Sequence, residues 1–149
     1  MLRISQRCEY AIQALLELAL RSGPQPVTIA DIAKAQRLPP KFLAVILAQL
    51  KQVGVVASVR GMRGGYRLAR PPQRITVGQV VQLLDGPVEP LHADPGAGAG
   101  DPQPPGGSLF EVRQQIRRAV EHVLDQTTLA DLVERESRRR AARVSNYCI

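Results

Sequence analysis

A helix, a tight break, a second helix and a glycine-rich hairpin follow one another between residues 28 and 70, and this order constrains the fold more than any other feature. Thr28, three residues before an aspartate, is a typical helix cap and predicts a first helix over residues 28–36. Two prolines then break the helical pattern. Because proline is tolerated in a first helical turn, a second helix is predicted over residues 40–53. These elements predict a helix-turn-helix.

The hairpin predicted after the second helix has the composition of a DNA-binding wing. Residues 55–59 and 66–69 are β-prone, and they flank the segment Arg-Gly-Met-Arg-Gly-Gly at 60–65. A tip that lacks side-chain bulk but carries arginines fits the narrow minor groove, where negative potential attracts guanidinium groups. The predicted fold class is therefore mainly α with a small β-hairpin wing, a winged helix-turn-helix.

A long C-terminal helix, predicted from residue 108 to about 126, carries apolar residues at three- and four-residue spacing. Such a seam is typical of a helix that pairs with another helix, which predicts a dimerisation helix and a homodimer. At one level of the seam either Ala119 or Val120 fits the spacing. The predicted interface residues are Leu109, Val112, Ile116, Val120 and Val123.

The domain organisation follows from these elements and from one change of composition. Twelve of the 22 residues at 86–107 are Gly or Pro, and such a segment buries too few side chains to offset its ordering entropy. We therefore predict a winged helix-turn-helix domain at 1–87 and a flexible loop at 88–107. Dimerisation helices at 108–143 and a C-terminal tail at 144–149 complete the chain.

Positive charge is concentrated in the N-terminal part of the chain. The formal net charge is +7, and residues 1–91 hold 12 Lys or Arg against 5 Asp or Glu. A basic surface favours a polyanionic partner, here double-stranded DNA. A single exposed arginine is usually only a solvated charge, so the prediction depends on order, spacing and charge together. The candidate DNA-binding residues are Thr28, Pro39, Lys41, Phe42, Lys51, Arg60, Arg63 and Arg67.

Several other classes of protein are disfavoured. The two cysteines form no CxxC pair, the N-terminus does not resemble a signal peptide, and no apolar run approaches the roughly 18 residues of a membrane span. We therefore expect a cytoplasmic protein without a membrane partner. The two histidines are 30 residues apart, no nucleophile motif is present, and the glycines at 61–65 lack the Lys-Ser/Thr of a P-loop. No enzyme activity, catalytic residue, metal or cofactor is predicted.

Three stretches carry a resemblance to a known family. They are Arg3-Ile4-Ser5 with Glu9-Tyr10-Ala11, residues 50–56, and above all the wing segment Arg-Gly-Met-Arg-Gly-Gly-Tyr-Arg-Leu at 60–68. They resemble the Rrf-type family of bacterial winged helix-turn-helix transcriptional regulators, which includes the iron–sulfur cluster regulator, the nitric-oxide-sensitive repressor and the cysteine metabolism repressor. The resemblance covers residues 1 to about 87 and, more loosely, 108–135. It implies a dimeric regulator, a repressor, that binds a near-palindromic promoter site.

The chain also departs from that family. Cluster-bearing members carry three cysteines in the loop before the dimer helix, whereas residues 92–107 contain none, so a cluster-free member is expected. Cys8 is interpreted as a small core residue, with a redox sensor as the alternative. Ala44 and Val45 stand where the iron–sulfur regulator has polar base readers. Few direct base contacts are therefore expected, with more readout through the wing and DNA shape.

The last residues resemble the cysteine metabolism repressor branch, whose tails dock into the active site of cysteine synthase. Tyr147 and Ile149 are the candidate partner-binding residues, since a free carboxylate beside an aliphatic side chain suits capture in an apolar cleft. A frayed terminus is the simpler interpretation. Two hypotheses therefore stand: a repressor that controls cysteine or sulfur metabolism, and a protein-binding sensor whose tail docks into such an enzyme. Steep salt dependence of duplex binding distinguishes the first from the second.

Overall fold

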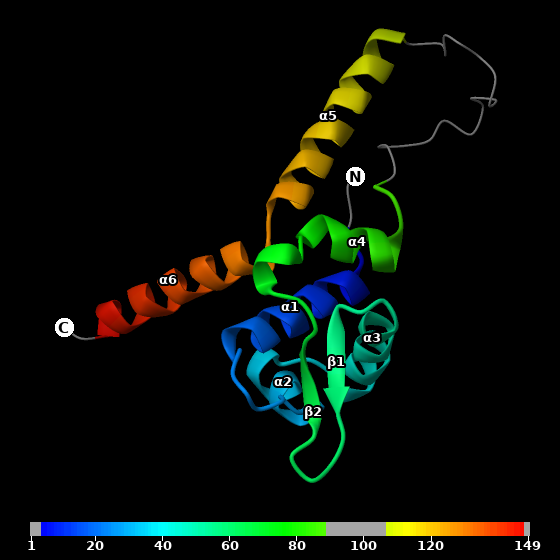
Figure 1. The fold of residues 1–149 in the computed structure, drawn as a ribbon. Helices are drawn as coiled ribbons and strands as arrows, with labels where there is room; N and C mark the ends of the chain where they lie inside the picture. The colour runs from blue at the N-terminus through cyan, green and yellow to red at the C-terminus, as the bar shows by residue number, and fades with distance from the viewer. Residues whose placement is uncertain (1–3, 89–106, 148–149) are drawn as a thin grey trace.

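The computed structural model of the chain describes residues 4–88 and 107–147. It is mainly α-helical with one two-stranded antiparallel hairpin, which confirms the predicted fold class (Figure 1). In chain order the elements are α1 (Gln6–Leu20), α2 (Ile29–Gln36), α3 (Pro40–Gln52), β1 (Val56–Val59), β2 (Gly65–Leu68), the 3-10 helix η1 (Pro72–Arg74), α4 (Val77–Asp85), α5 (Gly107–Gln126) and α6 (Leu129–Tyr147).

Helix α1 packs against α2, α3, α4, α6 and β2, so it forms the centre of the core. Ser5 caps it by accepting a hydrogen bond from the backbone N–H of Cys8 at 3.1 Å. The core is aliphatic, and each large side chain buried in it contributes about 1.5–3 kcal/mol. The inner face of α3 belongs to this core, with Leu43, Ile46, Leu47 and Leu50 at most 2% exposed.

One charged side chain lies inside this core. Glu17 of α1 is only 3% exposed, and its two carboxylate oxygens accept hydrogen bonds from Arg21 Nε at 2.5 Å and from Gln36 Nε2 at 2.8 Å. A buried carboxylate is tolerated when both oxygens have donors. Gln36 is the last residue of α2, so this polar contact holds the end of that helix against α1.

Strand β2 of the hairpin is joined to the segment that precedes α2. Within the hairpin, Val56 pairs with Leu68 and Val59 with Gly65. Val27 and Tyr66 form a further antiparallel bridge with two N–H···O bonds of 2.8 Å. A Cβ atom at Gly65 would lie 2.5 Å from the Val27 carbonyl oxygen, so glycine is required for this close approach. The bridge fixes the hairpin relative to α2.

The long C-terminal helices are attached to the N-terminal unit through a second bridge. The backbone N–H of Val77 donates to the Thr127 carbonyl at 2.8 Å, and that of Leu129 donates to the Ile75 carbonyl at 2.9 Å. Leu129 is fully buried in the core. The junction between α5 and α6 is therefore held directly against the start of α4.

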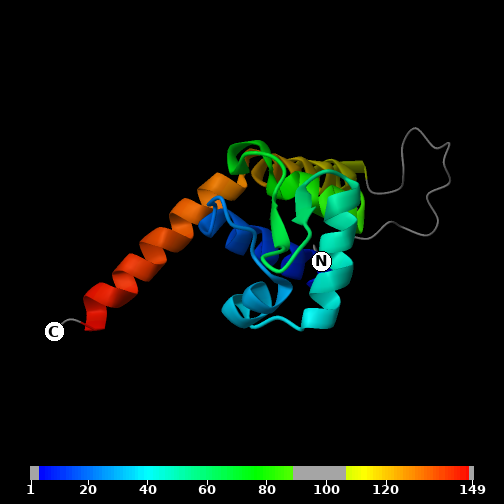
Figure 2. The same cartoon turned by 60° about the horizontal axis from the view of Figure 1, so that its bottom comes forward.

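Helix α6 is longer than predicted. Thr128 caps its first turn, and hydrogen bonds from the Thr128 backbone N–H and hydroxyl lower the pKa of Asp131. The helix continues to Tyr147, so residues 144–147 are helical and no separate tail begins at residue 144. The segment 129–147 contains no Gly or Pro, and ion pairs four residues apart favour the extension. Both views show α6 extending away from the body of the molecule (Figures 1 and 2).

Most of the predicted flexible loop at 88–107 lies outside the described residues, which resume at residue 107. In the described part of the chain, no helix combines the length and the apolar character that crossing a bilayer requires.

Candidate nucleic-acid interface

The turn between α2 and α3 sets the angle at which α3 is presented. Arg37 ends α2 in the left-handed region, at φ 54° and ψ 46°, and the Leu38 N–H donates to the Ala33 carbonyl at 2.9 Å. Pro39, in extended conformation, then precedes Pro40 in the first turn of α3. The prolines predict the break, but no sequence pattern predicts the left-handed conformation of Arg37, because arginine does not normally adopt it.

The outer face of α3 carries three of the predicted DNA-binding residues. Lys41 and Phe42 lie in the first turn and Lys51 in the last turn, and all three are exposed. The predicted Pro39 is exposed immediately before the helix. The first turn of a recognition helix is the part that meets base edges in a helix-turn-helix. The two lysines, one at each end, are placed to meet phosphates.

The wing turn presents Arg60 and Arg63 as exposed side chains on either side of Met62. Gly61 adopts φ +116°, and its carbonyl accepts from the Gly64 N–H at 3.0 Å, which closes the turn. The turn projects beyond α2 and α3 at the lower end of the molecule (Figure 1). Met62 is fully exposed at this tip, and the sequence analysis did not select it.

The charged side chains of this surface are almost all cationic. Residues 28–67, which contain the two helices and the hairpin, hold seven Lys or Arg and a single acidic residue, Asp31. All seven cationic side chains are exposed. Such a field attracts a polyanion and accelerates its association.

Asp31, the single acidic residue of this surface, lies beside Thr28, another candidate DNA-binding residue. Thr28 caps α2: its hydroxyl oxygen accepts from the Asp31 N–H at 3.1 Å and donates to an Asp31 carboxylate oxygen at 2.8 Å. A helix N-terminus is a place where a DNA phosphate can bind, but here a negative side chain already occupies it. The DNA contact of Thr28 stays a prediction, and the neighbouring carboxylate opposes a contact with a phosphate.

Arg70 supports α3, a role that the sequence analysis missed. Its guanidinium donates to the carbonyls of Gly54 at 3.1 Å and Val53 at 3.2 Å, at the C-terminal end of α3. A cation at this end of a helix satisfies free carbonyls and opposes the negative end of the helix dipole. No local sequence signal identifies this contact, because Arg70 reaches the carbonyls from beyond the hairpin.

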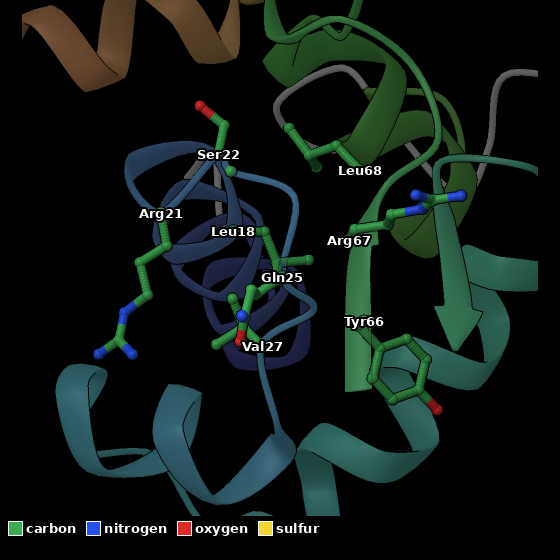
Figure 3. Close-up of a pocket in the computed structure, with 9 residues that line it drawn as sticks. Leu18, Arg21, Ser22, Gln25, Val27, Tyr66, Arg67 and Leu68 are labelled. Carbon is green, nitrogen blue, oxygen red and sulfur yellow. The ribbon is translucent and has the colours of Figure 1, made fainter. Parts of the chain in front are cut away.

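A cavity of about 290 Å³ lies between the end of α1 and strand β2. Leu18, Val27 and Leu68 contribute its apolar lining, and the predicted DNA-binding residue Arg67 lies at its edge. The guanidinium groups of Arg21 and Arg67 point away from one another and from the cavity (Figure 3). The two cations therefore do not converge on an anion within it, and Arg67 remains available to the outer surface.

The seam predicted on α5 is exposed in the single chain. Leu109, Val112, Ile116 and Val123 are 43–62% exposed, although they are large and apolar. Ala119 is exposed and Val120 is half-buried, so exposure favours Ala119 at the level where either residue fits the spacing, and the interface role of Val120 stays a prediction. An apolar stripe of this length on one helix marks an interaction surface. We use "α5 stripe" below for Leu109, Val112, Ile116, Ala119 and Val123.

The helix-turn-helix, the basic hairpin beside it and the long helices behind them define a winged helix-turn-helix DNA-binding protein. The family model of Rrf2, described as an iron-dependent transcriptional regulator, matches residues 4–135. The chain belongs to the Rrf2 family of transcriptional regulators.

Individual relatives agree with this assignment. The regulator CymR of Bacillus subtilis is 34% identical over 88% of this chain and 89% of its own length. IscR of Cereibacter sphaeroides is 32% identical over 92% of this chain and 90% of its own length. The solved structure of B. subtilis CymR has a TM-score of 0.78 and covers 90% of this chain and 98% of its own. The solved structure of T. potens IscR has a TM-score of 0.72 and covers 91% of this chain and 88% of its own.

The family description raises the question of iron, and the side chains of this protein do not fit an iron–sulfur cluster. Such clusters are held mainly by cysteine thiolates, and this chain has only Cys8 and Cys148. Cys8 is fully buried, and burial, with the carboxylates of Asp85 and Glu9, raises the pKa of its thiol to about 12. Within residues 4–88 and 107–147, no three His, Cys, Asp or Glu side chains are grouped as metal ligands.

The same burial predicts that Cys8 is inert. We expect the Cys148→Ser variant, in which Cys8 is the single thiol, to react negligibly with a thiol-labelling reagent at pH 8 in the native state. The reason is that the reactive thiolate is disfavoured by burial and inaccessible to the reagent. Unfolding in guanidinium should release one reactive thiol per chain, which serves as the internal control. Rapid labelling of the folded variant would instead support the redox-sensor interpretation.

The structure describes only one of the two candidate residues for partner docking. Tyr147 is 89% exposed in the last described turn of α6. Ile149 lies outside the described residues. Docking of the tail into an enzyme therefore stays a prediction.

Proposed function

We propose that this chain is a cytoplasmic, homodimeric repressor that binds near-palindromic promoter sites and works without an iron–sulfur cluster. The observation that carries the proposal is the pairing of two surfaces on one chain. One is the cationic surface formed by the helix-turn-helix and the wing. The other is the α5 stripe, which lies on a helix outside that unit.

The α5 stripe supports the dimeric state. Large apolar side chains at a/d-like spacing lose their contact with water when two such helices pair, at about 25 cal/mol for each Å² buried. Pairing by a twofold axis presents two recognition helices and two wings to one face of a duplex, so the operator is expected to mirror that symmetry.

Control of cysteine or sulfur metabolism is the regulatory role that we propose. Its support is similarity to CymR, described as the global cysteine regulator of B. subtilis. The absence of a cysteine set for a cluster favours a signal other than cluster assembly.

The test combines binding and genome-wide mapping. Purified protein should bind promoter duplexes as two chains per site, and the logarithm of its affinity should fall steeply with the logarithm of salt concentration, with a slope of about −0.9 per phosphate contact. Bound sites mapped in the source cell should include genes of sulfur metabolism, whose transcripts rise when the protein is removed. Monomeric binding, or binding without salt dependence, would contradict the proposal.

A further inference from the structure

The recognition helix has an unusual outer face for a protein that reads DNA sequence. Between its terminal lysines, the exposed side chains of α3 are apolar: Phe42 is 61% and Val45 is 59% exposed, and Ala44 and Ala48 are exposed beside them. We call these four residues the α3 apolar face. They lie opposite the buried face that packs on α1 and β1.

The one polar side chain within this stretch is directed elsewhere. Gln49 is half-buried, and its side-chain oxygen accepts a hydrogen bond from Arg7 of α1. From residue 42 to residue 48, α3 therefore offers no hydrogen-bonding side chain to an outside partner. This part of the helix cannot read the pattern of donors and acceptors by which most base pairs are distinguished.

The surroundings of the α3 apolar face match the major groove. Lys41 and Lys51 flank it along the helix, and the wing arginines Arg60 and Arg63 extend the positive charge beyond it. A groove lined by phosphates on both sides presents complementary negative charge at these positions. An apolar protein partner would lack that complementarity, and it is the other outcome of the test below.

One feature of the major-groove floor is apolar, the 5-methyl group of thymine, which small aliphatic and aromatic side chains contact. We propose that the α3 apolar face selects operators by packing Phe42 and Val45 against thymine methyl groups. Ala44 and Ala48 permit the close approach that this packing requires. The proposal rests on the proposed function, and it assigns direct base readout to the α3 positions where few base contacts were expected from the sequence.

The test begins with full-length protein and a pool of random duplexes. Selection should enrich sites with thymine at two or more positions in each half-site. Each such thymine is then replaced by uracil, which removes the methyl group and leaves the hydrogen-bonding edges and the minor groove unchanged. We expect a loss of about fourfold in affinity for each methyl group removed.

Two variants locate the contact. Val45→Ala should lower affinity for the selected site and should abolish the effect of uracil at one position. Val53→Ala makes the same chemical change at a residue that is 42% exposed beyond the end of α3, and it should bind and discriminate like the parent protein.

The possible results separate the two proposals. Enriched sites that bind equally well with uracil, or that consist of G·C pairs at the α3 positions, overturn thymine readout and leave the proposed function standing. A pool without any enriched sequence overturns both, and it would favour a protein as the partner of the α3 apolar face.

Discussion

Replacing Ile116 by arginine is expected to convert the proposed dimer into a monomer and to remove high-affinity DNA binding. Ile116 lies at the middle of the α5 stripe and is 43% exposed in the single chain. In a twofold pair of α5 stripes, the substitution would place two guanidinium groups in an apolar contact, because the stripe itself contains no acidic residue. An uncompensated buried charge costs about 3–5 kcal/mol, which raises the dissociation constant of the dimer by roughly 10²–10⁴.

The effect on DNA follows from the loss of linkage between two half-sites. A dimer binds its second half-site at the effective concentration set by the first, and a monomer lacks this advantage. We therefore expect affinity for a two-half-site duplex to fall at least about a hundredfold, while affinity for a single half-site is unchanged. Analytical ultracentrifugation measures the first effect and duplex titration measures the second.

His122→Arg is the matched control, since His122 is also exposed on α5 but is not a residue of the α5 stripe. This variant gains the same side chain and should remain dimeric. Circular dichroism of both variants separates dissociation from unfolding. A dimeric Ile116→Arg protein with full affinity would show that the pairing surface lies elsewhere.

The parts of this fold that could be predicted are those with a local signal. Four helices begin after a capping residue whose side chain accepts a hydrogen bond from the backbone N–H three residues further on. The capping residues are Ser5, Thr28, Thr76 and Thr128, and residue types that cap helices can be recognised in the sequence. The inner face of α3 could be predicted for a similar reason, since periodicity alone separates buried from exposed positions.

The parts that could not be predicted depend on contacts between distant residues. Three such contacts join residues 16 to 39 positions apart: the Val27–Tyr66 bridge, the hydrogen bond of Gln36 to Glu17, and the contact of Arg70 with the end of α3. The end of α6 was misjudged because helix-favouring residues continue past the apolar pattern that served to define it. At the candidate site, residue types indicated where charge lies, but only the exposure of Phe42 and Val45 revealed the apolar face of the recognition helix.

Removal of the wing arginines is expected to have the second largest effect. Arg60 and Arg63 are exposed at the projecting turn, which the Val27–Tyr66 bridge holds in a fixed position relative to α2. Because the backbone of the turn is held in this way, little backbone freedom is lost when its arginines enter a narrow minor groove. We expect Arg60→Ala to weaken operator binding by about 1–3 kcal/mol for each half-site at fixed salt. The double variant with Arg63→Ala should weaken it further.

Salt dependence and two further variants identify what the arginines contact. Loss of a phosphate contact reduces the salt slope by about 0.9, whereas loss of a contact to a base edge lowers affinity with the slope unchanged. Arg60→Lys keeps the charge without the planar guanidinium, so it should preserve the slope and restore only part of the affinity. Arg118→Ala removes the same charge from an exposed site on α5, a helix that extends away from the wing (Figure 1), and should bind nearly as the parent does. Equal affinities for Arg60→Ala and Arg118→Ala would show that the wing makes no specific contact, and α3 would then carry the recognition alone.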